Sequence, residues 1–312
     1  MKKIFLIFPN QLFKVKKQFS QVKYIALIQD SLFFGCDSQW KQKFHCQKII
    51  FHKATMDSYE KDLKSHRFNV IYIKHKRKTR TEDNLKYLLE KGFNYFITYE
   101  AFDWSLEKRI KDFTLKNNTK LEIIKNDMFL TCKEKSEEIL NQKKFYGMQK
   151  FYKSQRQSLN ILIEKDGSPT GGDWSFDKMN RKKLSKAINV PRIPTIETNK
   201  FIDKAKKDVY INYGDYYGSH EKFNYPISHK EAEEWLDNFF VERFNLFGDY
   251  EDAIHSSHRT LWHSVLSPLI NSGLLTPRQI IDKSWDFYQS NNIGINSYEG
   301  FVRQIIGWRE FI

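Results

Sequence analysis

The chain has 312 residues, of which 40% are hydrophobic and 16% aromatic, so it can bury large cores and is not a disordered polypeptide. Its 52 Lys and Arg against 38 Asp and Glu give a net charge of +14, which favours nucleic acid as a partner over an anionic membrane. No apolar run approaches the roughly 18 residues of a membrane-spanning helix. The three cysteines lack metal-ligand spacing, as expected of reduced thiols in a cytoplasmic protein.

Five short apolar runs at the start of the chain are typical of strands buried on both faces of a sheet. Polar, helix-competent segments alternate with them, most clearly Met56–Lys64, Thr81–Lys91 and Asp103–Lys116. This alternation predicts a parallel α/β domain over residues 1–125. The predicted strands are Ile4–Phe8, Tyr24–Gln29, Val70–Ile73, Tyr95–Tyr99 and Leu121–Ile124.

Polar residues follow the first two predicted strands, where parallel sheets bind their ligands. Asn10 and Gln11 precede Leu12 after the first strand, and Asp30 follows the second. Such side chains can bind a polar heterocycle, although they also form ordinary turns and helix caps. The basic run Lys74–Arg80 after the third strand is either a secondary DNA contact or a solvated loop.

Residues 126–227 are predicted to form a linker helix, within about 135–163, and an irregular connector. The segment Asp166–Gly172 breaks the helical pattern. From residue 228 to 312 only helices are expected. The segments Ser228–Glu231 and Thr276–Gln279 have the sequence of capping boxes and mark two helix starts.

Two groups of polar residues lie between these helix starts. Ser264 and Ser267 stand just before Pro268, so their hydroxyl groups could bind a diphosphate at a helix end, although serine is more often an ordinary cap. The histidines His255, His258 and His263 lack an acidic partner at zinc-ligand spacing. We therefore predict no metal site.

The last fourteen residues have the pattern of an amphipathic helix. Phe301, Ile305, Trp308 and Ile312 fall on one stripe at helical spacing, with Arg303, Arg309 and Glu310 outside it. Taken alone, the pattern predicts an exposed Glu299–Arg303 pair worth about 0.2–0.5 kcal/mol.

Several motifs in order resemble the photolyase-related proteins of the cryptochrome/photolyase superfamily, specifically the bacterial iron–sulfur (6-4) photolyase type. The resemblance spans the chain, and its last two motifs are the most specific. The motifs are Phe8-Pro-Asn-Gln-Leu12, Gly171-Gly-Asp-Trp-Ser-Phe-Asp177 with Asn180-Arg-Lys182, Phe247-Gly-Asp-Tyr-Glu-Asp-Ala253, the Ser-x-Leu-Ser segment of His263–Pro268, Asn271-x-Gly-Leu-Leu275 and the Trp-Arg-Glu-Phe segment of Glu299–Phe311.

The resemblance implies a Rossmann-like or flavodoxin-like antenna domain followed by an all-α FAD-binding domain. Light-excited, reduced FAD would repair a (6-4) photoproduct in double-stranded DNA by electron transfer. Family residues carried over to this chain imply FAD contacts by Tyr250, Asp252, His263, Ser264, Leu266, Ser267, Glu299, Arg303, Trp308 and Arg309. They also imply contacts to a 6,7-dimethyl-8-ribityllumazine antenna by Asn10, Gln11, Leu12 and Asp30.

The chain departs from the family pattern at its C-terminal end. The family's catalytic histidine, further FAD contacts and the cysteines of its iron–sulfur cluster would lie beyond Ile312, so no catalytic residue is assigned and the FAD-binding domain is expected to be incomplete. We expect activity to need a second polypeptide that supplies this portion. The alternatives are a non-catalytic chromophore- or DNA-binding protein and an inactive remnant.

Overall fold

The structure is a computed structural model that describes residues 1–15, 19, 21–141, 147–185 and 188–312. By contact it divides into two compact units. The first contains Met1–Asn126, Thr195–Ala232 and Asn271–Leu274, and the second contains Asp127–Pro194, Glu233–Ile270 and Leu275–Ile312. The boundaries at residues 125 and 227 stay predictions, and residues 142–146 of the predicted linker helix lie outside the described residues.

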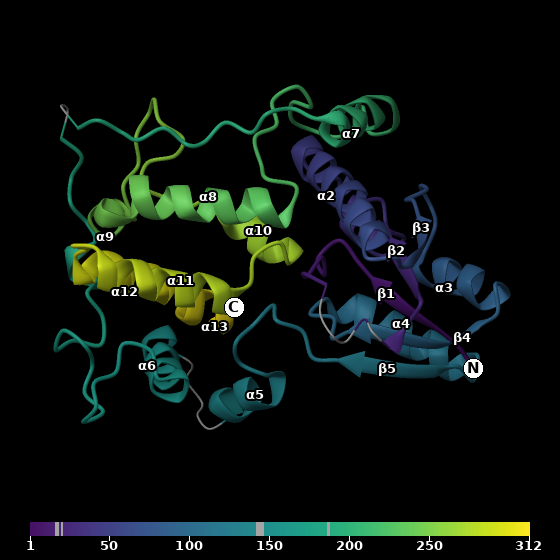
Figure 1. Ribbon diagram of the computed structural model, residues 1–312, viewed down its shortest axis with the longest axis horizontal. Helices are drawn as coiled ribbons and strands as arrows, with labels where there is room; N and C mark the ends of the chain where they lie inside the picture. The colour runs from purple at the N-terminus through teal and green to yellow at the C-terminus, as the bar shows by residue number, and fades with distance from the viewer. Residues whose placement is uncertain (16–18, 20, 142–146, 186–187) are drawn as a thin grey trace. The chain divides into compact units, whose positions relative to one another are not determined.

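The first unit contains a parallel sheet of five strands in the order β3-β2-β1-β4-β5, shown in Figure 1. All five predicted strands are confirmed, with ends shifted by at most two residues. Neighbouring strands pair in parallel throughout, for example Leu6 with Ala26 and Phe5 with Ile97. The strands are β1 (Lys2–Ile7), β2 (Tyr24–Ile28), β3 (Asn69–Ile73), β4 (Phe93–Tyr99) and β5 (Lys120–Ile124).

Helices cover both faces of this sheet, as its doubly apolar strands require. On one face α3 (Thr81–Glu90) and α4 (Trp104–Lys116) bury Leu85 and Ile110 against strand residues such as Leu6. The short helix α1 (Ser31–Phe34) follows β2. The helix predicted at Met56–Lys64 is the second half of α2 (Cys46–Ser65), which packs against α7 (Lys200–Asn212). The predicted α/β architecture is therefore correct.

Outside the sheet the regular elements are helices, and residues 228–312 are helical as predicted, but α7 lies in the stretch that was predicted to be an irregular connector. The capping box at Ser228–Glu231 occurs, since the Ser228 hydroxyl accepts from the Glu231 amide at 3.3 Å and the Glu231 carboxylate accepts from the Ser228 amide at 3.1 Å. At the second predicted box the Thr276 hydroxyl accepts from the Gln279 amide at 3.3 Å, but the Gln279 side chain donates to Glu233, so only the N-cap half is confirmed. The elements are α5 (Lys133–Asn141), α6 (Met148–Leu159), η2 (Asp177–Met179), α8 (His229–Glu242), η3 (Phe244–Leu246), α9 (Phe247–Tyr250), α10 (Ser267–Ser272), α11 (Pro277–Ser290), α12 (Ile295–Val302), the π-helical η4 (Arg303–Trp308) and α13 (Arg309–Phe311).

A cluster of phenylalanines forms the centre of the helical unit. The Phe301 ring lies 5.0 Å from Phe239 and 5.3 Å from Phe244, measured between centroids. The glycine in the Phe247–Ala253 motif allows α9 to approach α12, because a Cβ on Gly248 would lie 2.5 Å from the Ser297 backbone nitrogen. This close packing positions the residues that follow α9.

The described residues contain no helix long and apolar enough to cross a membrane. All three cysteines are free thiols. The Tyr216 hydroxyl donates to the Cys36 sulfur at 3.2 Å, and the Cys46 sulfur lies 3.6 Å from the Tyr216 carbonyl oxygen.

Candidate functional site

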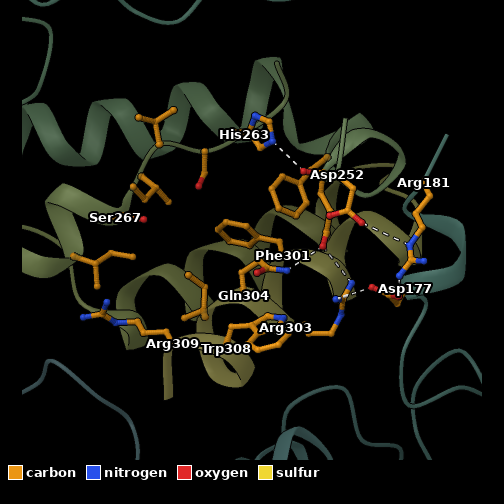
Figure 2. Close-up of a pocket in the computed structure, with 17 residues that line it drawn as sticks. Asp177, Arg181, Asp252, His263, Ser267, Phe301, Arg303, Gln304, Trp308 and Arg309 are labelled. Carbon is orange, nitrogen blue, oxygen red and sulfur yellow. Dashed lines mark hydrogen bonds and ion pairs between the residues drawn. The ribbon is translucent and has the colours of Figure 1, made fainter. Parts of the chain in front are cut away.

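A cavity of about 650 Å³ lies within the helical unit, within the size range of cofactor sites. Its walls come from the segment before α10 and from the helix that contains η4 (Figure 2). Aromatic and aliphatic side chains such as Phe301 and Ile305 form its middle. Its other lining residues are Asp177, Arg181, Phe247, Glu251, Asp252, His263, Ser264, Val265, Leu266, Ser267, Ile270, Arg303, Gln304, Trp308 and Arg309.

The segment Ser264–Ser267 has a strained backbone. Val265 adopts a φ of 56°, in the left-handed region that a β-branched residue rarely enters and that costs about 1–3 kcal/mol. The Trp235 indole holds the segment by donating to the Ser264 carbonyl oxygen at 3.1 Å. Within the described residues, the Ser264 and Ser267 hydroxyls make no hydrogen bond. They are therefore available to a ligand.

The opposite wall is a helix whose winding changes within the site. Segment η4 is π-helical, which inserts extra backbone per turn and is frequent at functional sites. Phe301 and Ile305 of the predicted stripe are 1% and 6% exposed, but Trp308 is 40% and Ile312 96% exposed. The predicted stripe is therefore correct only in its first half, because a π turn rotates the following residues out of α-helical register.

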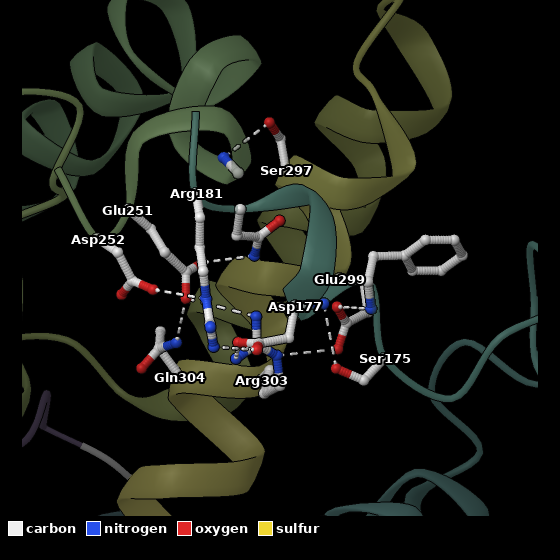
Figure 3. A network of polar contacts seen from close by, with 12 residues as sticks. Ser175, Asp177, Arg181, Glu251, Asp252, Ser297, Glu299, Arg303 and Gln304 are labelled. Carbon is white, nitrogen blue, oxygen red and sulfur yellow. Dashed lines mark hydrogen bonds and ion pairs between the residues drawn. The ribbon is translucent and has the colours of Figure 1, made fainter. Parts of the chain in front are cut away.

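A buried ion cluster stands at one end of the cavity and is shown in Figure 3. The Arg303 guanidinium donates to Asp177 at 3.1 Å, to Glu251 at 3.4 Å and to Glu299 at 3.2 Å. We call this group the Arg303 cluster; it also includes Gln304 and Asn180, whose amides donate to Glu251 at 2.9 and 3.0 Å.

The predicted exposed pair Glu299–Arg303 is wrong. The Glu299 side chain is wholly buried and that of Arg303 is 4% exposed. Glu299 also accepts from the Phe176 amide at 2.9 Å, so it joins η2 to α12 and does not line the cavity. Glu299 is buried because the connector Asp173–Asp177 covers this part of α12. Arg156 fixes this connector by donating to the Trp174 carbonyl oxygen at 2.9 Å.

Burial raises the pKa of Glu251 to about 7, although Arg303 acts in the opposite direction. The nearby carboxylates of Asp252, Glu299 and Asp177 raise it further. One arginine cannot offset desolvation together with several negative charges. This end of the cavity can therefore hold or release a proton near neutral pH.

The other end of the cavity has a different chemistry. Ser267 and Arg309 lie there, away from Asp177 and Asp252 (Figure 2). Arg309 approaches the Met128 sulfur at 3.0 Å and the Phe129 ring at 5.0 Å. Glu310, which we expected outside the stripe, is not simply solvated, since it accepts from the amides of Leu130 and Thr131 at 2.8 and 3.0 Å.

The cavity thus contains most of the residues predicted to contact FAD: Asp252, His263, Ser264, Leu266, Ser267, Arg303, Trp308 and Arg309. Glu299 and Tyr250 are not in its lining, and Tyr250 packs on Trp262 with 4.6 Å between ring centroids. Asp177, Glu251 and Gln304 were missed. Glu251 and Asp177 belong to motifs that carry the family resemblance, and this signal could have identified them.

The four residues predicted to contact lumazine lie in the first unit. Gln11 and Leu12 are buried, and their polar groups bind protein: the Gln11 amide lies 3.4 Å from the Tyr99 carbonyl oxygen, and the Leu12 amide donates to Ser272 at 2.8 Å. The buried Asn10 Oδ1 has no partner within the described residues. Burial raises the pKa of Asp30 to about 6 against a hydrogen bond from the Leu32 amide.

A second cavity of about 750 Å³ shares Asp177, Arg181, Arg303 and Trp308 with the first. Its other walls include Lys150 and two aromatic side chains, Tyr152 and Trp174. Arg303 and Trp308 therefore stand between two spaces in the same unit. One space offers hydroxyl and guanidinium groups, and the other offers aromatic faces beside cations.

Comparisons with known proteins identify the family of this chain. The family model for deoxyribodipyrimidine photo-lyase-related protein matches residues 5–225. A (6-4) photolyase of Agrobacterium fabrum is 25% identical over 272 residues, which cover 86% of this chain and 54% of that protein. The chain thus spans about half the length of this relative. A relative from Acanthamoeba polyphaga mimivirus, named uncharacterized protein R852, is 27% identical over 198 residues, which cover 60% of this chain and 98% of that protein.

The fold has a counterpart among solved structures. The crystal structure of a bacterial class III photolyase from Agrobacterium tumefaciens matches with a TM-score of 0.59 and 14% identity. The match covers 99% of this chain and 57% of that chain. This likeness supports the arrangement of a parallel α/β domain and a helical region.

Proposed function

The chain belongs to the deoxyribodipyrimidine photo-lyase-related protein family, and from this premise we propose that it binds FAD in the cavity of the helical unit and takes part in light-driven repair of (6-4) photoproducts in DNA. One observation carries the proposal. The Ser264–Ser267 segment and η4, which are far apart in sequence and both resemble flavin-contacting motifs, line the same cavity.

The residues present suit one end of such a cofactor. Hydroxyls of Ser264 and Ser267 would donate to the diphosphate, and Arg309 would supply positive charge at the same end. The strain at Val265 supports this assignment, since strained backbone gathers at ligand sites. The carboxylates of the Arg303 cluster exclude phosphate from the opposite end, so we place the uncharged part of the flavin towards Phe301 and Gln304.

When bound, FAD would supply the light-excited electron donor for the reaction. The protein's own part would be to hold the cofactor, exclude water from the Phe301 side and receive a flipped lesion near Trp308. Trp308 is 40% exposed and borders both cavities, which suits stacking on a base. Double-stranded DNA with a UV lesion is the proposed substrate, and the charge of +14 supports phosphate contacts.

Further proposals concern the rest of the site. Asn10 supports a lumazine site, because a buried acceptor without a partner suits a ligand with N–H groups.

The three cysteines do not fit an iron–sulfur cluster, since no three potential metal ligands gather in the described part of the chain. We propose that a second polypeptide completes the FAD site; a relative matched over 98% of its own length shows that shorter separate chains occur.

Flavin retention tests the cofactor assignment. We expect the purified protein, alone or with its partner, to retain FAD, measured by the absorption of flavin released on denaturation. The double exchange Ser264→Asp with Ser267→Asp should reduce binding at least tenfold, because two carboxylates would repel the diphosphate. The matched control is Ser256→Asp with Ser257→Asp, in the same connecting segment but outside the cavity lining. Equal loss of flavin in both variants, or full retention in the first, would refute the diphosphate site.

Co-expression tests the second polypeptide separately. The portion of the Agrobacterium (6-4) photolyase that this chain does not match can serve as the probe. Co-purification with increased flavin content is expected. If this chain retains FAD alone and does not bind the fragment, the partner proposal fails while the cofactor assignment stands. Retained DNA binding without light-dependent repair would favour the non-catalytic alternative.

A further inference from the structure

Three aromatic side chains of the first unit are unusually exposed. Trp40 is 60% exposed, Phe102 43% and Trp104 68%. They follow β2 and β4, at the carboxyl edge of the parallel sheet where such folds bind ligands. We call these three residues the aromatic edge. Large aromatic side chains that remain in water near one another indicate a binding surface.

The aromatic edge is held in place by a buried ion pair. Arg109 of α4 donates to both carboxylate oxygens of Asp37 at 2.8 Å and to Gln39 at 2.8 Å. Asp37 in turn accepts from the Trp40 amide at 3.3 Å. The Trp40 indole donates to the Ser105 hydroxyl at 3.1 Å. These bonds fix Trp40 beside the start of α4, where Trp104 lies.

The same ion pair joins the basic loop Lys74–Arg80 to this edge. Arg109 approaches the Thr81 hydroxyl at 3.4 Å, and the Ser31 hydroxyl lies between the Thr79 carbonyl oxygen at 2.6 Å and Asp37 at 3.4 Å. The end of the loop and the aromatic edge are therefore anchored to the same buried ion pair within this unit.

Four exposed lysines on this surface make no ion pair with a carboxylate within the described residues: Lys41, Lys76, Lys78 and Lys108. Two of the nearby acids are already engaged. Asp103 caps α4 by accepting from the Leu106 amide at 2.9 Å, and Glu107 pairs with Lys111. Lys108 lies 5.0 Å from the centre of the Trp104 ring. The surface therefore combines unpaired positive charge with exposed aromatic faces.

We propose that the aromatic edge and these four lysines bind single-stranded nucleic acid without sequence preference. Exposed aromatic rings stack on unpaired bases, and lysines follow the phosphates. A duplex fits less well, since its base faces are covered by stacking. An acidic protein would use the lysines but has no flat bases for the tryptophans. This site is separate from the FAD cavity and does not rest on FAD binding.

Fluorescence anisotropy with a labelled 20-nucleotide poly(dT) strand and a 20-base-pair duplex tests the proposal. The strand should bind more tightly than the duplex and quench tryptophan emission. Trp104→Ala should weaken strand binding by roughly 5- to 160-fold, the range of one base stack. Lys76→Glu with Lys78→Glu should lower the slope of log affinity against log salt by about 1.4, since single strands contribute about 0.7 for each phosphate contact.

Matched controls come from the opposite edge of the same sheet. Helices of a parallel α/β unit run back against the strands, so the C-terminal ends of α2, α3 and α4 lie at the amino edge. Lys61→Glu with Lys116→Glu changes the charge equally there, and Tyr87→Ala removes an aromatic side chain that is 44% exposed. All variants are first checked for an unchanged melting temperature, and Trp40→Ala provides a second stacking variant.

We expect the controls to bind the strand like the parent chain. Equal weakening by the control lysine pair would attribute binding to net charge alone and overturn the proposal. Binding of heparin with the same sensitivity to Trp104→Ala would also overturn it, because heparin has no bases. Unchanged strand affinity in both tryptophan variants would exclude stacking at this surface.

Discussion

Each unit contains a buried arginine at the centre of its polar contacts. The two arginines form ion pairs with different numbers of carboxylates. In the sheet unit, Arg109 faces the single carboxylate of Asp37 in a bidentate pair. In the helical unit, Arg303 faces three carboxylates, of which Glu299 is wholly buried. Arg109 therefore forms an ion pair with one carboxylate, although Asp30 and Glu82 lie close enough to act on it electrostatically, whereas Arg303 forms ion pairs with three.

This difference appears in the pKa values. Burial alone would raise the pKa of Asp37, but hydrogen bonds from Arg109 and from the Gln39 amide lower it to about 2. Burial raises the pKa of Glu251 to about 7, and Arg303 only partly opposes this. The bidentate bond from Arg109 keeps Asp37 ionised and stabilises the structure. The three carboxylates around Arg303 leave Glu251 able to titrate near neutral pH, as expected at a functional site.

Replacing the arginines gives the largest expected effect. Arg303→Met should lower the free energy of unfolding by about 3–5 kcal/mol, because it leaves the buried carboxylates of Glu251 and Glu299 without compensation. Arg109→Met should cost less, about 2–3 kcal/mol, since Asp37 keeps the amides of Gln39 and Trp40. Urea denaturation at pH 7.5 measures both. A larger loss of unfolding free energy for Arg109→Met than for Arg303→Met would contradict this difference between the two arginines.

The pH dependence of stability is the second test. The pKa of Glu251 is about 7 in the fold and 4.5 in the unfolded chain. Between these values the folded protein holds a proton that the unfolded chain has lost, so this group makes the protein less stable as pH rises. Glu251→Gln should therefore add about 3 kcal/mol at pH 8 and almost nothing at pH 4.5. Unfolding at a series of pH values measures this difference.

Asp37 has the opposite sign and supplies the control. Its lowered pKa contributes stability above pH 4 that is lost as pH falls towards 2, so Asp37→Asn should remove acid sensitivity in that window alone.

For Glu251→Gln, a new amide group needs an acceptor. The buried Asn180 Oδ1 lacks a partner within the described residues and could accept after rotation of its amide. If the gain at pH 8 is absent, the pKa of Glu251 is not raised in the folded protein.

Local patterns were sufficient to predict the fold. Runs such as Ile4–Phe8 and Tyr95–Tyr99 are apolar throughout because both faces of the strand are covered, and runs this short and rich in β-branched and aromatic residues favour strands over helices. Capping residues such as Ser228 and Thr276 act on amides three residues away, so they too can be identified from the sequence. The α/β unit and the helix starts depend on such short-range rules.

Several features of the site depend on backbone winding and on contacts between residues far apart in sequence, which local patterns do not reveal. A π turn at η4 is not encoded in residue spacing, so the exposure of Trp308 could not be predicted. Burial of Glu299 requires the connector near Phe176, which lies far away in sequence. The strain at Val265 is a property of the folded backbone. Ser264 and Ser267 were found only because their motif resembles a known family.

The test of packing inside the Arg303 cluster has the smallest expected change in the free energy of unfolding. A Cβ on Gly300 would lie 2.6 Å from Glu251 Oε2 and 2.7 Å from Asn180 Nδ2. In an ordinary helix, Gly→Ala stabilises by about 1 kcal/mol, but here Gly300→Ala should destabilise by about 1–2 kcal/mol because the carboxylate must move. In a Glu251→Ala background the same change should become neutral or stabilising, since Asn180 can then shift into the vacated space. A double-mutant cycle from urea denaturation measures this coupling. Additive effects would show that Gly300 does not make room for Glu251, and the crowding of carboxylates around Arg303 would then not depend on this glycine.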